Sequence, residues 1–258
     1  MDLGLAGKTA IVCASSRGLG RACAEALARE GCRVVINGRD EVRLAEAHDA
    51  ITAKGAEAIA VRADLSTEEG RAALVAAAPT AGILVTNNGG PTPGRFTDWD
   101  EAAWHAALEA NMVAPIMLIR ALLPGMRARR FGRIVNITSA MVKSPQLPMG
   151  LSTAARSGLT ALAKALSREA AKDNVTVNNL LPERIETARL RSMTERLAAH
   201  RGIDFEEARA EMLKPVAAGR FGTPEEFGDA CAFLCSAQAG YITGQNLQID
   251  GGSYEGLI

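Results

Sequence analysis

Short apolar runs alternate with longer segments of helical spacing along this chain of 258 residues. Most of the runs have apolar residues at consecutive positions, as in strands that are buried on both faces of a parallel sheet. The segments between them, such as 19–30 and 41–54, repeat apolar residues every three or four positions, as amphipathic helices do. This alternation predicts a doubly wound α/β fold with a seven-stranded parallel sheet. The predicted strands span residues 9–14, 33–37, 58–62, 83–86, 133–138, 175–180 and 246–249.

A longer helical pattern begins at Leu151 and predicts a helix that contacts the core or another subunit. Its apolar face consists of Leu151, Ala155, Leu159, Leu162, Ala163, Leu166 and Ala170. No linker, repeat or low-complexity segment interrupts the chain, so residues 1–258 predict a single domain. Segment 183–215 is richer in charge, and its residues alone are compatible with a solvated pair of helices.

The charge and the apolar content of the chain argue against a nucleic-acid-binding, secreted or membrane-spanning protein. The 29 basic and 29 acidic residues cancel, so the chain lacks the positive excess that nucleic-acid binding requires. Residues 1–8 lack the charged start and apolar core of a signal peptide. No uninterrupted apolar run reaches the roughly 18 residues of a membrane span. We therefore expect a soluble cytoplasmic protein.

The five cysteines include no Cys-x-x-Cys pair. Three fall near the first predicted strand–helix unit, and the other two share one face of a later predicted helix. We expect reduced thiols in the apolar core, and neither a disulfide nor a metal site. The positions are Cys13, Cys23, Cys32, Cys231 and Cys235.

A glycine turn, Gly18-Leu19-Gly20, follows the first predicted strand and opens the first predicted helix. Glycine lets the backbone turn tightly and approach a pyrophosphate, which the positive end of the helix attracts. Cys23 occupies the third glycine position of the Gly-x-Gly-x-x-Gly pattern, so a plain strand–helix turn is the alternative. The turn predicts a dinucleotide site that includes Ser15, Ser16, Arg17, Gly18, Leu19 and Gly20.

The residues after the second predicted strand bear on the choice between NAD and NADP. An acidic residue there would bind the ribose 2′-hydroxyl of NAD. This chain has Asn37-Gly38-Arg39 and no carboxylate before Asp40. Arg39, together with Arg17 in the glycine turn, offers two guanidinium groups for the 2′-phosphate of NADP. The pair favours NADP(H) as the cofactor.

The order of these motifs resembles that of the short-chain dehydrogenase/reductase family, over nearly the whole chain. The family pattern is Thr-Gly-x-x-x-Gly-x-Gly, then Asn-Asn-Ala-Gly, Asn, Ser, Tyr-x-x-x-Lys and Pro-Gly. The chain is most similar to an atypical branch of 3-oxoacyl-carrier-protein-reductase-like proteins that lack the Tyr-x-x-x-Lys pair. The matching segments are 13–20, 86–89, Asn111, Ser139, 151–156 and Pro182-Glu183.

This resemblance implies further cofactor contacts. Asp64 and Leu65 would border the adenine, whereas Asn87, Asn88 and Gly89 would pass close to the adenosine ribose. The nicotinamide end would be held by Pro182, Ile185 and Thr187. Two family glycines are replaced, by Ala14 in the first turn and by Glu183 after Pro182. Segment 183–215 would cover the substrate.

The resemblance also implies a reaction. In the family, tyrosine protonates the carbonyl oxygen that serine binds, lysine lowers the tyrosine pKa and holds the ribose, and asparagine anchors a relay water. Ser139 and Asn111 match the serine and the asparagine, but Ser152 and Arg156 stand where the family has tyrosine and lysine. The chain's two tyrosines, Tyr241 and Tyr254, match neither position.

Another proton donor is therefore needed, and Lys143 is one candidate. It follows Ser139 on the loop that borders the substrate in the family, and a lysine partly buried beside Arg156 would have a lowered pKa. An exposed loop lysine is the alternative. The histidines at 48, 105 and 200 fall in predicted helices away from every motif, so we expect surface positions for them.

Two hypotheses follow. In the first, the chain is an NADP(H)-dependent oxidoreductase that reduces a 3-oxoacyl-like carbonyl or a related C=N or C=C group with non-standard proton delivery. In the second, it is a catalytically impaired dinucleotide-binding sensor or assembly subunit. The expected partners are a small-molecule or acyl-carrier substrate and further copies in a homotetramer, through helices beginning near Ala103 and Leu151.

Overall fold

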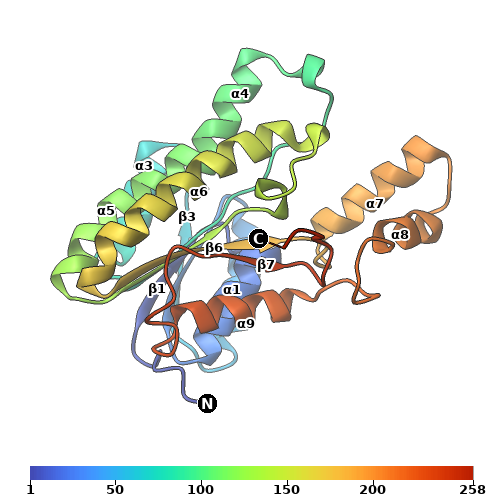
Figure 1. The fold of residues 1–258 in the computed structure, drawn as a ribbon. Coiled ribbons are helices and arrows are strands. Elements are labelled where there is room, and N and C mark those ends of the chain that lie inside the picture. Colours follow the sequence, from blue (N-terminus) through green and yellow to red (C-terminus); the bar gives the residue numbers. More distant parts are fainter. Residues whose placement is uncertain (258) are drawn as a thin grey trace.

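Seven parallel strands form one sheet in the computed structural model, which describes residues 1–257 (Figure 1). The strand order is β3-β2-β1-β4-β5-β6-β7, so the chain reverses its direction of winding between β1 and β4. At such a reversal the connecting loops diverge and leave a crevice at the carboxyl ends of the strands. The strands are β1 Thr9–Val12, β2 Arg33–Gly38, β3 Ala58–Arg62, β4 Ile83–Thr86, β5 Gly132–Ile137, β6 Val175–Pro182 and β7 Asn246–Ile249.

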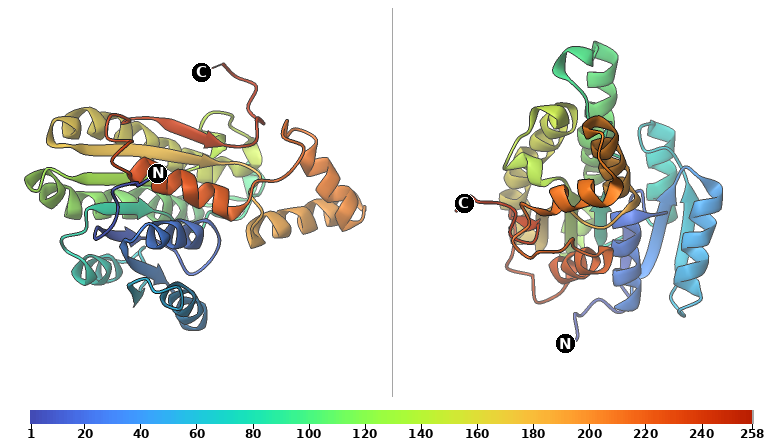
Figure 2. Two further views of the ribbon diagram at one scale, coloured as in Figure 1. Left: turned by 90° about the horizontal axis from the view of Figure 1, so that it is seen from below. Right: turned by 90° about the vertical axis from the view of Figure 1, so that its right-hand side faces the viewer.

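Helices cover both faces of the sheet, as the alternating pattern predicts (Figures 1 and 2). One face packs against α1 (Gly18–Arg29), α2 (Glu41–Thr52) and α9 (Pro224–Cys235). The other packs against α3 (Glu68–Ala77), α5 (Ala114–Ala128) and α6 (Gly150–Ala170). The side chains of each strand alternate between the two cores, which is why the central strands are apolar at consecutive positions.

All seven predicted strands and the doubly wound class are confirmed, with differences at the strand ends. β1 ends at Val12, before the predicted end at 14, because Ala14 adopts a left-handed φ of 44° that no strand can continue. β6 continues to Pro182, paired with β7. The edge strands β3 and β7 are only partly buried, since each has a neighbour on one side alone.

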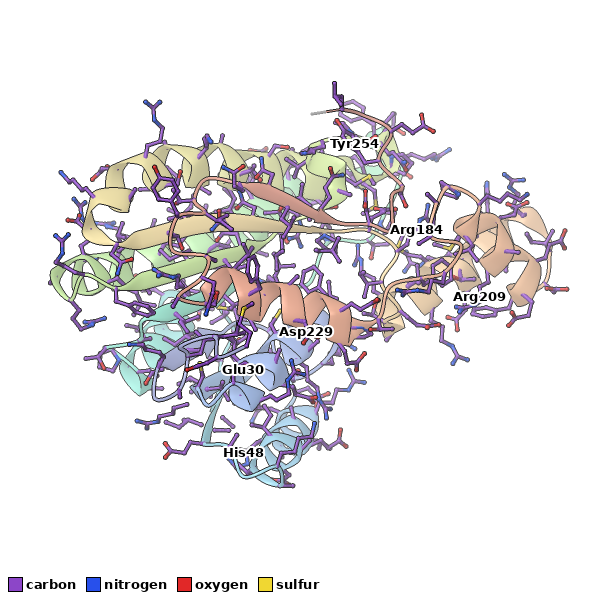
Figure 3. The ribbon with its side chains drawn as sticks, turned by 60° about the horizontal axis from the view of Figure 1, so that its bottom comes forward. Glu30, His48, Arg184, Arg209, Asp229 and Tyr254 are labelled. Carbon is purple, nitrogen blue, oxygen red and sulfur yellow. The ribbon has the colours of Figure 1, made fainter. Side chains whose placement is uncertain are left out.

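The five cysteines are free thiols in the interior, as predicted. Burial raises the pKa of Cys13 to about 12, so this thiol stays protonated and unreactive at neutral pH. The histidines lie on α2, on α4 (Glu101–Leu108) and on α7 (Ala188–Arg201). Figure 3 places His48 on the outer helix α2, away from Arg184 at the end of β6.

A continuous helix runs from Glu101 to Ala128 through α4, a π-helical turn at Glu109–Val113, and α5. It is long and apolar enough to cross a membrane, although the sequence lacks an uninterrupted apolar run of that length. Helix α5 packs against the sheet through Leu118, Ile119 and Leu122. A helix in the core of a soluble protein has the same length and composition, so this helix is weak evidence for a membrane span.

Helices α7 and α8 (Phe205–Leu213) project beyond the carboxyl edge of the sheet as a pair (Figures 1 and 2). Thr187 and Asp204 cap their N-termini with side-chain oxygens, and Gly202 ends α7 in a left-handed conformation. The pair shares a small apolar cluster with the segment that follows α8, formed by Leu190, Met212 and Phe221. The charged segment 183–215 is thus a helical pair.

Replacing Ala14 with glycine should stabilise the protein by about 1 kcal/mol, because the left-handed backbone penalises any residue that carries a Cβ. Urea unfolding of the Ala14→Gly variant measures the change. Ala45→Gly is the matched control, because Ala45 is exposed in the interior of α2, where glycine should cost about 1 kcal/mol. Destabilisation by both substitutions would contradict the strain at Ala14.

Candidate active site

A cleft of about 920 Å³ opens where the strand order reverses, at the carboxyl edge of the sheet. Its walls come from the loops that follow strands β1 to β6, and from the first turn of α7. A cleft at this position in an open α/β sheet is where such folds bind their ligands. Its volume lies within the range of small-molecule and cofactor sites.

The glycine turn forms the floor of the cleft at the start of α1. A Cβ atom on Gly20 would lie 2.4 Å from the Ala14 carbonyl oxygen and 2.8 Å from Asn87 Nδ2, so only glycine fits there. Arg17 is the N-cap of α1, and its side chain makes no capping hydrogen bond. The first N–H groups of the helix can therefore bind a ligand phosphate. These features fit a dinucleotide.

Ser15 and Asn37 fix the position of the glycine turn by hydrogen bonds to the ends of the neighbouring strands. The buried Ser15 hydroxyl donates to the Val12 carbonyl oxygen at 2.7 Å and accepts the Asn37 N–H at 2.9 Å. The Asn37 amide donates to the carbonyl oxygens of Val61 and Ala63, both at 3.1 Å. Asn37 borders the cleft, whereas Ser15 lies outside its lining and its hydroxyl fixes the loop that surrounds the cleft.

Three arginines border the end of the cleft beside β2: Arg17, Arg39 and Arg43. Arg39 is highly exposed, and its Nη1 lies 3.4 Å from Asp64 Oδ2. The backbone N–H and the side chain of Ser66, followed by the charge of Arg39, lower the pKa of Asp64. Arg43 was not predicted from the sequence. It lies in the first turn of α2, whose position beside the cleft depends on how that helix packs.

Ser152 and Arg156 lie together on α6. Arg156 Nε donates to Ser152 Oγ at 3.1 Å, Nη1 to the Ile137 carbonyl oxygen at 2.5 Å, and Nη2 to the Asn88 carbonyl oxygen at 3.4 Å. Burial, together with the charge of the nearby Arg189, lowers the pKa of Arg156 to about 10. This pKa is below the value above 12 expected from the sequence, yet the guanidinium remains charged at neutral pH.

Ser139 borders the cleft at the end of β5, beside this pair. Its backbone is extended, and its hydroxyl accepts the Met141 N–H at 3.2 Å at the start of a short 3₁₀ turn. That hydrogen bond fixes the position of the oxygen and leaves its proton available for a ligand in the cleft. Two serine hydroxyls and a buried cation therefore face the same space.

Asn111 lies in the π-helical turn between α4 and α5. Its Nδ2 donates to the Ala107 carbonyl oxygen at 3.3 Å, whereas its buried Oδ1 has no hydrogen-bond partner among the described residues. Asn88 joins this turn to the loop after β4, because its Nδ2 donates to the Ala110 carbonyl oxygen at 3.0 Å. Asn111 lies outside the lining of the cleft. π-helical turns occur frequently at functional sites.

Lys143 also lies outside the lining of the cleft. Its Nζ is 5.3 Å from the centre of the Tyr254 ring, in the C-terminal tail. The side chain is half-buried, so Lys143 is not the fully exposed loop lysine of the alternative. Figure 3 shows Tyr254 beyond the end of the sheet.

Glu183 and Arg184 form an ion pair at the end of β6, with Glu183 Oε1 3.0 Å from Arg184 Nε. Arg184 adopts a left-handed φ of 54°. Burial raises the pKa of Glu183, while the charge of Arg184 opposes that shift and Asp250 adds to it. The carboxylate that replaces the family glycine is thus held at low solvent exposure with its charge balanced by a neighbour.

The raised pKa of Glu183 predicts a pH-dependent loss of stability. A carboxyl with a raised folded-state pKa stabilises the fold fully below its unfolded pKa, near 4.5, and this contribution is lost as the pH rises through the folded-state pKa. The melting temperature of the Glu183→Gln variant minus that of the unmodified protein should therefore increase as the pH rises from 4.5 to 8. Calorimetry of the two proteins measures this difference, and a difference that does not change with pH would contradict the prediction.

Arg189 is a further residue of the cleft that sequence reasoning missed. Its Nη1 and Nη2 donate to the carbonyl oxygens of Gly90 and Pro91, both at 3.1 Å. The side chain therefore joins the first turn of α7 to the loop after β4. No motif marks this arginine, because its role arises only when two distant segments meet.

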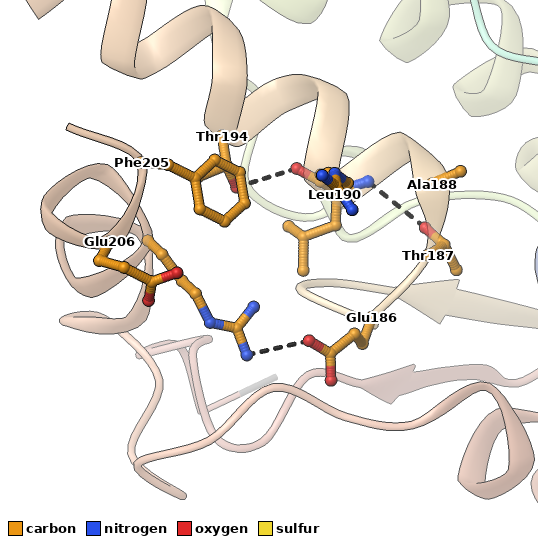
Figure 4. Close-up of a pocket in the computed structure, with 9 residues that line it drawn as sticks. Glu186, Thr187, Ala188, Leu190, Thr194, Phe205 and Glu206 are labelled. Atoms are coloured by element: carbon orange, nitrogen blue, oxygen red, sulfur yellow. Dashed lines mark hydrogen bonds and ion pairs between the residues drawn. The ribbon is translucent and has the colours of Figure 1, made fainter.

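A second, smaller cavity of about 390 Å³ lies between α7, α8 and the segment before them (Figure 4). Arg209 Nη2 lies 2.9 Å from Glu186 Oε1 across this space, and the Arg209 guanidinium is 4.6 Å from the centre of the Phe221 ring. Thr194 donates to the Leu190 carbonyl oxygen at 3.0 Å. Arg209 and Glu186 pair across this cavity, which is a junction between α7, α8 and the segment before them.

The cleft brings together most of the predicted site residues, from the segments that follow six strands and from helix α6. Ser15, Gly20, Asn111 and Lys143 are outside its lining. The residues that border it are Ser16, Arg17, Gly18, Leu19, Asn37, Gly38, Arg39, Asp64, Leu65, Asn87, Asn88, Gly89, Ser139, Ser152, Arg156, Pro182, Ile185 and Thr187.

Comparison with known proteins gives matches along nearly the whole chain. Residues 13–254 match the protein family described as enoyl-(acyl carrier protein) reductase. The chain is 34% identical to the Bacillus subtilis protein named uncharacterized oxidoreductase YvaG, with 98% of each protein covered. It is 33% identical to the 3-oxoacyl-(acyl-carrier-protein) reductase FabG of Vibrio cholerae, over 98% of this chain and 99% of that protein. The solved structure of L-sorbose reductase from Gluconobacter frateurii, in complex with NADPH and L-sorbose, is 32% identical, covers 100% of both chains, and has a TM-score of 0.94.

Proposed function

Because this chain belongs to the short-chain dehydrogenase/reductase family, we propose that it is an NADP(H)-dependent oxidoreductase with non-standard proton delivery. Its substrate carries a 3-oxoacyl-like carbonyl or a related C=N or C=C group. The observation that carries this proposal is the single cleft that holds the glycine turn, the arginines beside β2, and the group Ser139, Ser152 and Arg156.

The residues of the cleft fit a dinucleotide along its whole length. The glycine turn and the first N–H groups of α1 hold the pyrophosphate, while Arg17 and Arg39 bind the 2′-phosphate. Pro182, Ile185 and Thr187 hold the nicotinamide end. Arg156 adds one of its two remaining N–H groups to the nicotinamide ribose. When bound, NADPH supplies the hydride.

Ser139 and Ser152 bind the substrate oxygen with their hydroxyl groups. Ser152 Oγ already accepts the Arg156 Nε–H, so the serine's own proton points to another acceptor, the substrate oxygen. The guanidinium, charged at neutral pH, stabilises negative charge that develops on that oxygen through Ser152. Neither group is an efficient acid, because the serine hydroxyl is weakly acidic and Arg156 keeps its proton.

Water held by Asn111 supplies the proton. The buried Asn111 Oδ1 has no partner among residues 1–257, and a buried oxygen of this kind is typically satisfied by an ordered water. The π-helical turn sets the position of this oxygen, and Asn88 joins the turn to the wall of the cleft. Substrates that need little acid assistance, such as an iminium or an activated enone, suit this arrangement.

Lys143→Ala distinguishes the two sources of the proton. Since Lys143 rests on the Tyr254 ring outside the cleft lining, we expect the variant to retain at least about half of the turnover rate, with an unchanged pH profile. Steady-state rates across the pH range provide the measurement. A loss of about 100-fold, the usual contribution of a catalytic acid, would identify Lys143 as the donor.

The assembly and the covering segment complete the proposal. Helices α7 and α8, within segment 183–215, cover the substrate from the β6 side of the cleft. The apolar helices α4, α5 and α6 form the contacts of a cytoplasmic homotetramer. The substrate is a small molecule or is attached to an acyl carrier.

Loss of NADPH absorbance with a panel of substrates tests the function. The panel holds a 3-oxoacyl thioester, a simple ketone, a cyclic enone and a cyclic iminium, and fluorescence titration measures NADPH binding in parallel. We expect binding together with turnover of at least one class. Binding without any turnover would favour the alternative, a catalytically impaired sensor or assembly subunit, and failure to bind NADPH would overturn the proposal.

A further inference from the structure

Two guanidinium groups on one side of the cleft have no acidic partner among residues 1–257. Arg156 is 7% exposed, and it donates only to a hydroxyl and to two carbonyl oxygens. Arg189, which is solvent-exposed, donates to two carbonyl oxygens. Arg184 and Arg39, by contrast, each form an ion pair with a carboxylate that borders the same cleft.

The two groups converge on one short segment. Arg156 reaches the carbonyl oxygen of Asn88 from α6, and Arg189 reaches those of Gly90 and Pro91 from α7. They are close enough for the charge of Arg189 to act on the pKa of Arg156. Two like charges are thus brought together at the same wall of the cleft.

This arrangement is costly without an anion. A buried guanidinium that meets only neutral acceptors is not compensated for its lost hydration, and a second cation nearby adds repulsion. Each guanidinium has five N–H groups, of which these hydrogen bonds engage three on Arg156 and two on Arg189. Donors remain on both side chains, and a carboxylate can accept hydrogen bonds from two of them at once.

We propose that Arg156 and Arg189 form a subsite for a carboxylate carried by the substrate. The inference rests on the proposed function and narrows it to small oxo acids in their anionic form. Ser152, which binds the reacting oxygen, is hydrogen-bonded directly to Arg156, so the carboxylate lies only a few atoms from the carbonyl. A 2-oxo or a 3-oxo acid has this spacing. Glu183 does not oppose the anion, because Arg184 balances its charge.

Matched acids and esters test the subsite. The protein is saturated with NADP⁺, so that no turnover occurs, and titrated in a calorimeter with 2-oxobutanoate, 3-oxobutanoate and the methyl ester of each. We expect at least one acid to bind at least about tenfold more tightly than its ester, as for a charge-assisted bidentate contact. Equal binding of both pairs, or tighter binding of the esters, would overturn the inference.

Arg189→Gln is the decisive variant, because Arg156 is buried and its loss would threaten folding. We expect the acid-to-ester ratio to fall to about twofold or less, and Arg189→Lys to keep part of the preference. Arg201→Gln is the control, because Arg201 lies at the far end of the same helix and pairs with Glu211. A purely structural role for Arg189 would weaken acids and esters equally, leave their ratio unchanged, and so overturn the inference.

NADPH titration of the same variants separates the substrate anion from the cofactor phosphates. If Arg189→Gln weakened NADPH as much as the oxo acids, the guanidinium would serve a phosphate and the carboxylate subsite would be excluded. We expect NADPH affinity within about threefold of the unmodified protein. Should the unmodified protein fail to bind NADPH, the proposed function fails, while the acid-to-ester ratio of the cofactor-free protein still tests the subsite.

Discussion

The double variant Ser152→Tyr with Arg156→Lys is expected to reduce a neutral ketone at least about tenfold faster than the unmodified protein. The substitutions place a phenol beside an ammonium at the position where the cleft now holds a weakly acidic hydroxyl and a guanidinium that keeps its proton. The ammonium lowers the phenol pKa towards neutrality, and acid assistance of this kind contributes about 10² to 10⁴ in rate. Steady-state kcat with saturating NADPH is the measurement.

Ser152→Phe with Arg156→Lys is the matched control, because it adds the ring without the hydroxyl. We expect no gain from it. An equal gain in both double variants would assign the effect to packing and not to proton transfer. The absence of a gain in the tyrosine variant would place the limitation elsewhere in the cleft, at Glu183 or in the α7–α8 segment.

Replacing Arg17 and Arg39 with alanine is expected to weaken NADPH binding by about 100-fold and NADH binding by less than about threefold. Both side chains border the cleft at the β2 end. The two carboxylates that border this end, Asp40 and Asp64, are each paired with an arginine, so neither leaves an unbalanced negative charge to repel a phosphate. Removal of Arg39 also releases Asp64, whose negative charge then repels a 2′-phosphate. Fluorescence titration with each cofactor measures the two affinities.

Arg21→Ala serves as the control for this pair, since Arg21 lies on the same helix but pairs with Glu25 outside the cleft. Arg43→Ala shows how much the third arginine of this end contributes. Equal affinities of the unmodified protein for NADPH and NADH would contradict the assignment of Arg17 and Arg39.

The sheet was predictable because buried parallel strands must be apolar on both faces, a pattern visible in the residues of β1, β2, β4 and β5. The sequence could not predict where β1 ends, because alanine gives no signal for the left-handed backbone that Ala14 adopts. Edge strands were recognised from the same pattern but are less buried than it suggests, since exposure depends on position in the sheet.

The site was predictable where a short motif marks it, and less so where distant segments meet. The resemblance to the family motifs predicted that Ser139, Ser152 and Arg156 lie together, and all three border one cleft. Arg189 and Arg43 escaped notice because each borders the cleft only through the packing of its helix. Nothing in the sequence indicates that the Ser15 hydroxyl turns inward, where it joins the ends of β1 and β2.

The small apolar cluster of the α7–α8 pair has a consequence for access to the cleft. Leu190, Met212 and Phe221 pack with one another, apart from the two large cores beside the sheet. A segment with so few buried contacts forms its own cooperative unit, whose local opening costs much less than global unfolding. Helices α7 and α8 can thus release from the loop after β4, once Arg189 leaves the carbonyls of Gly90 and Pro91, while the sheet keeps its shape. Amide hydrogen exchange would then be fast in these helices and slow in the central strands. Ligands would enter the cleft when the two helices open transiently.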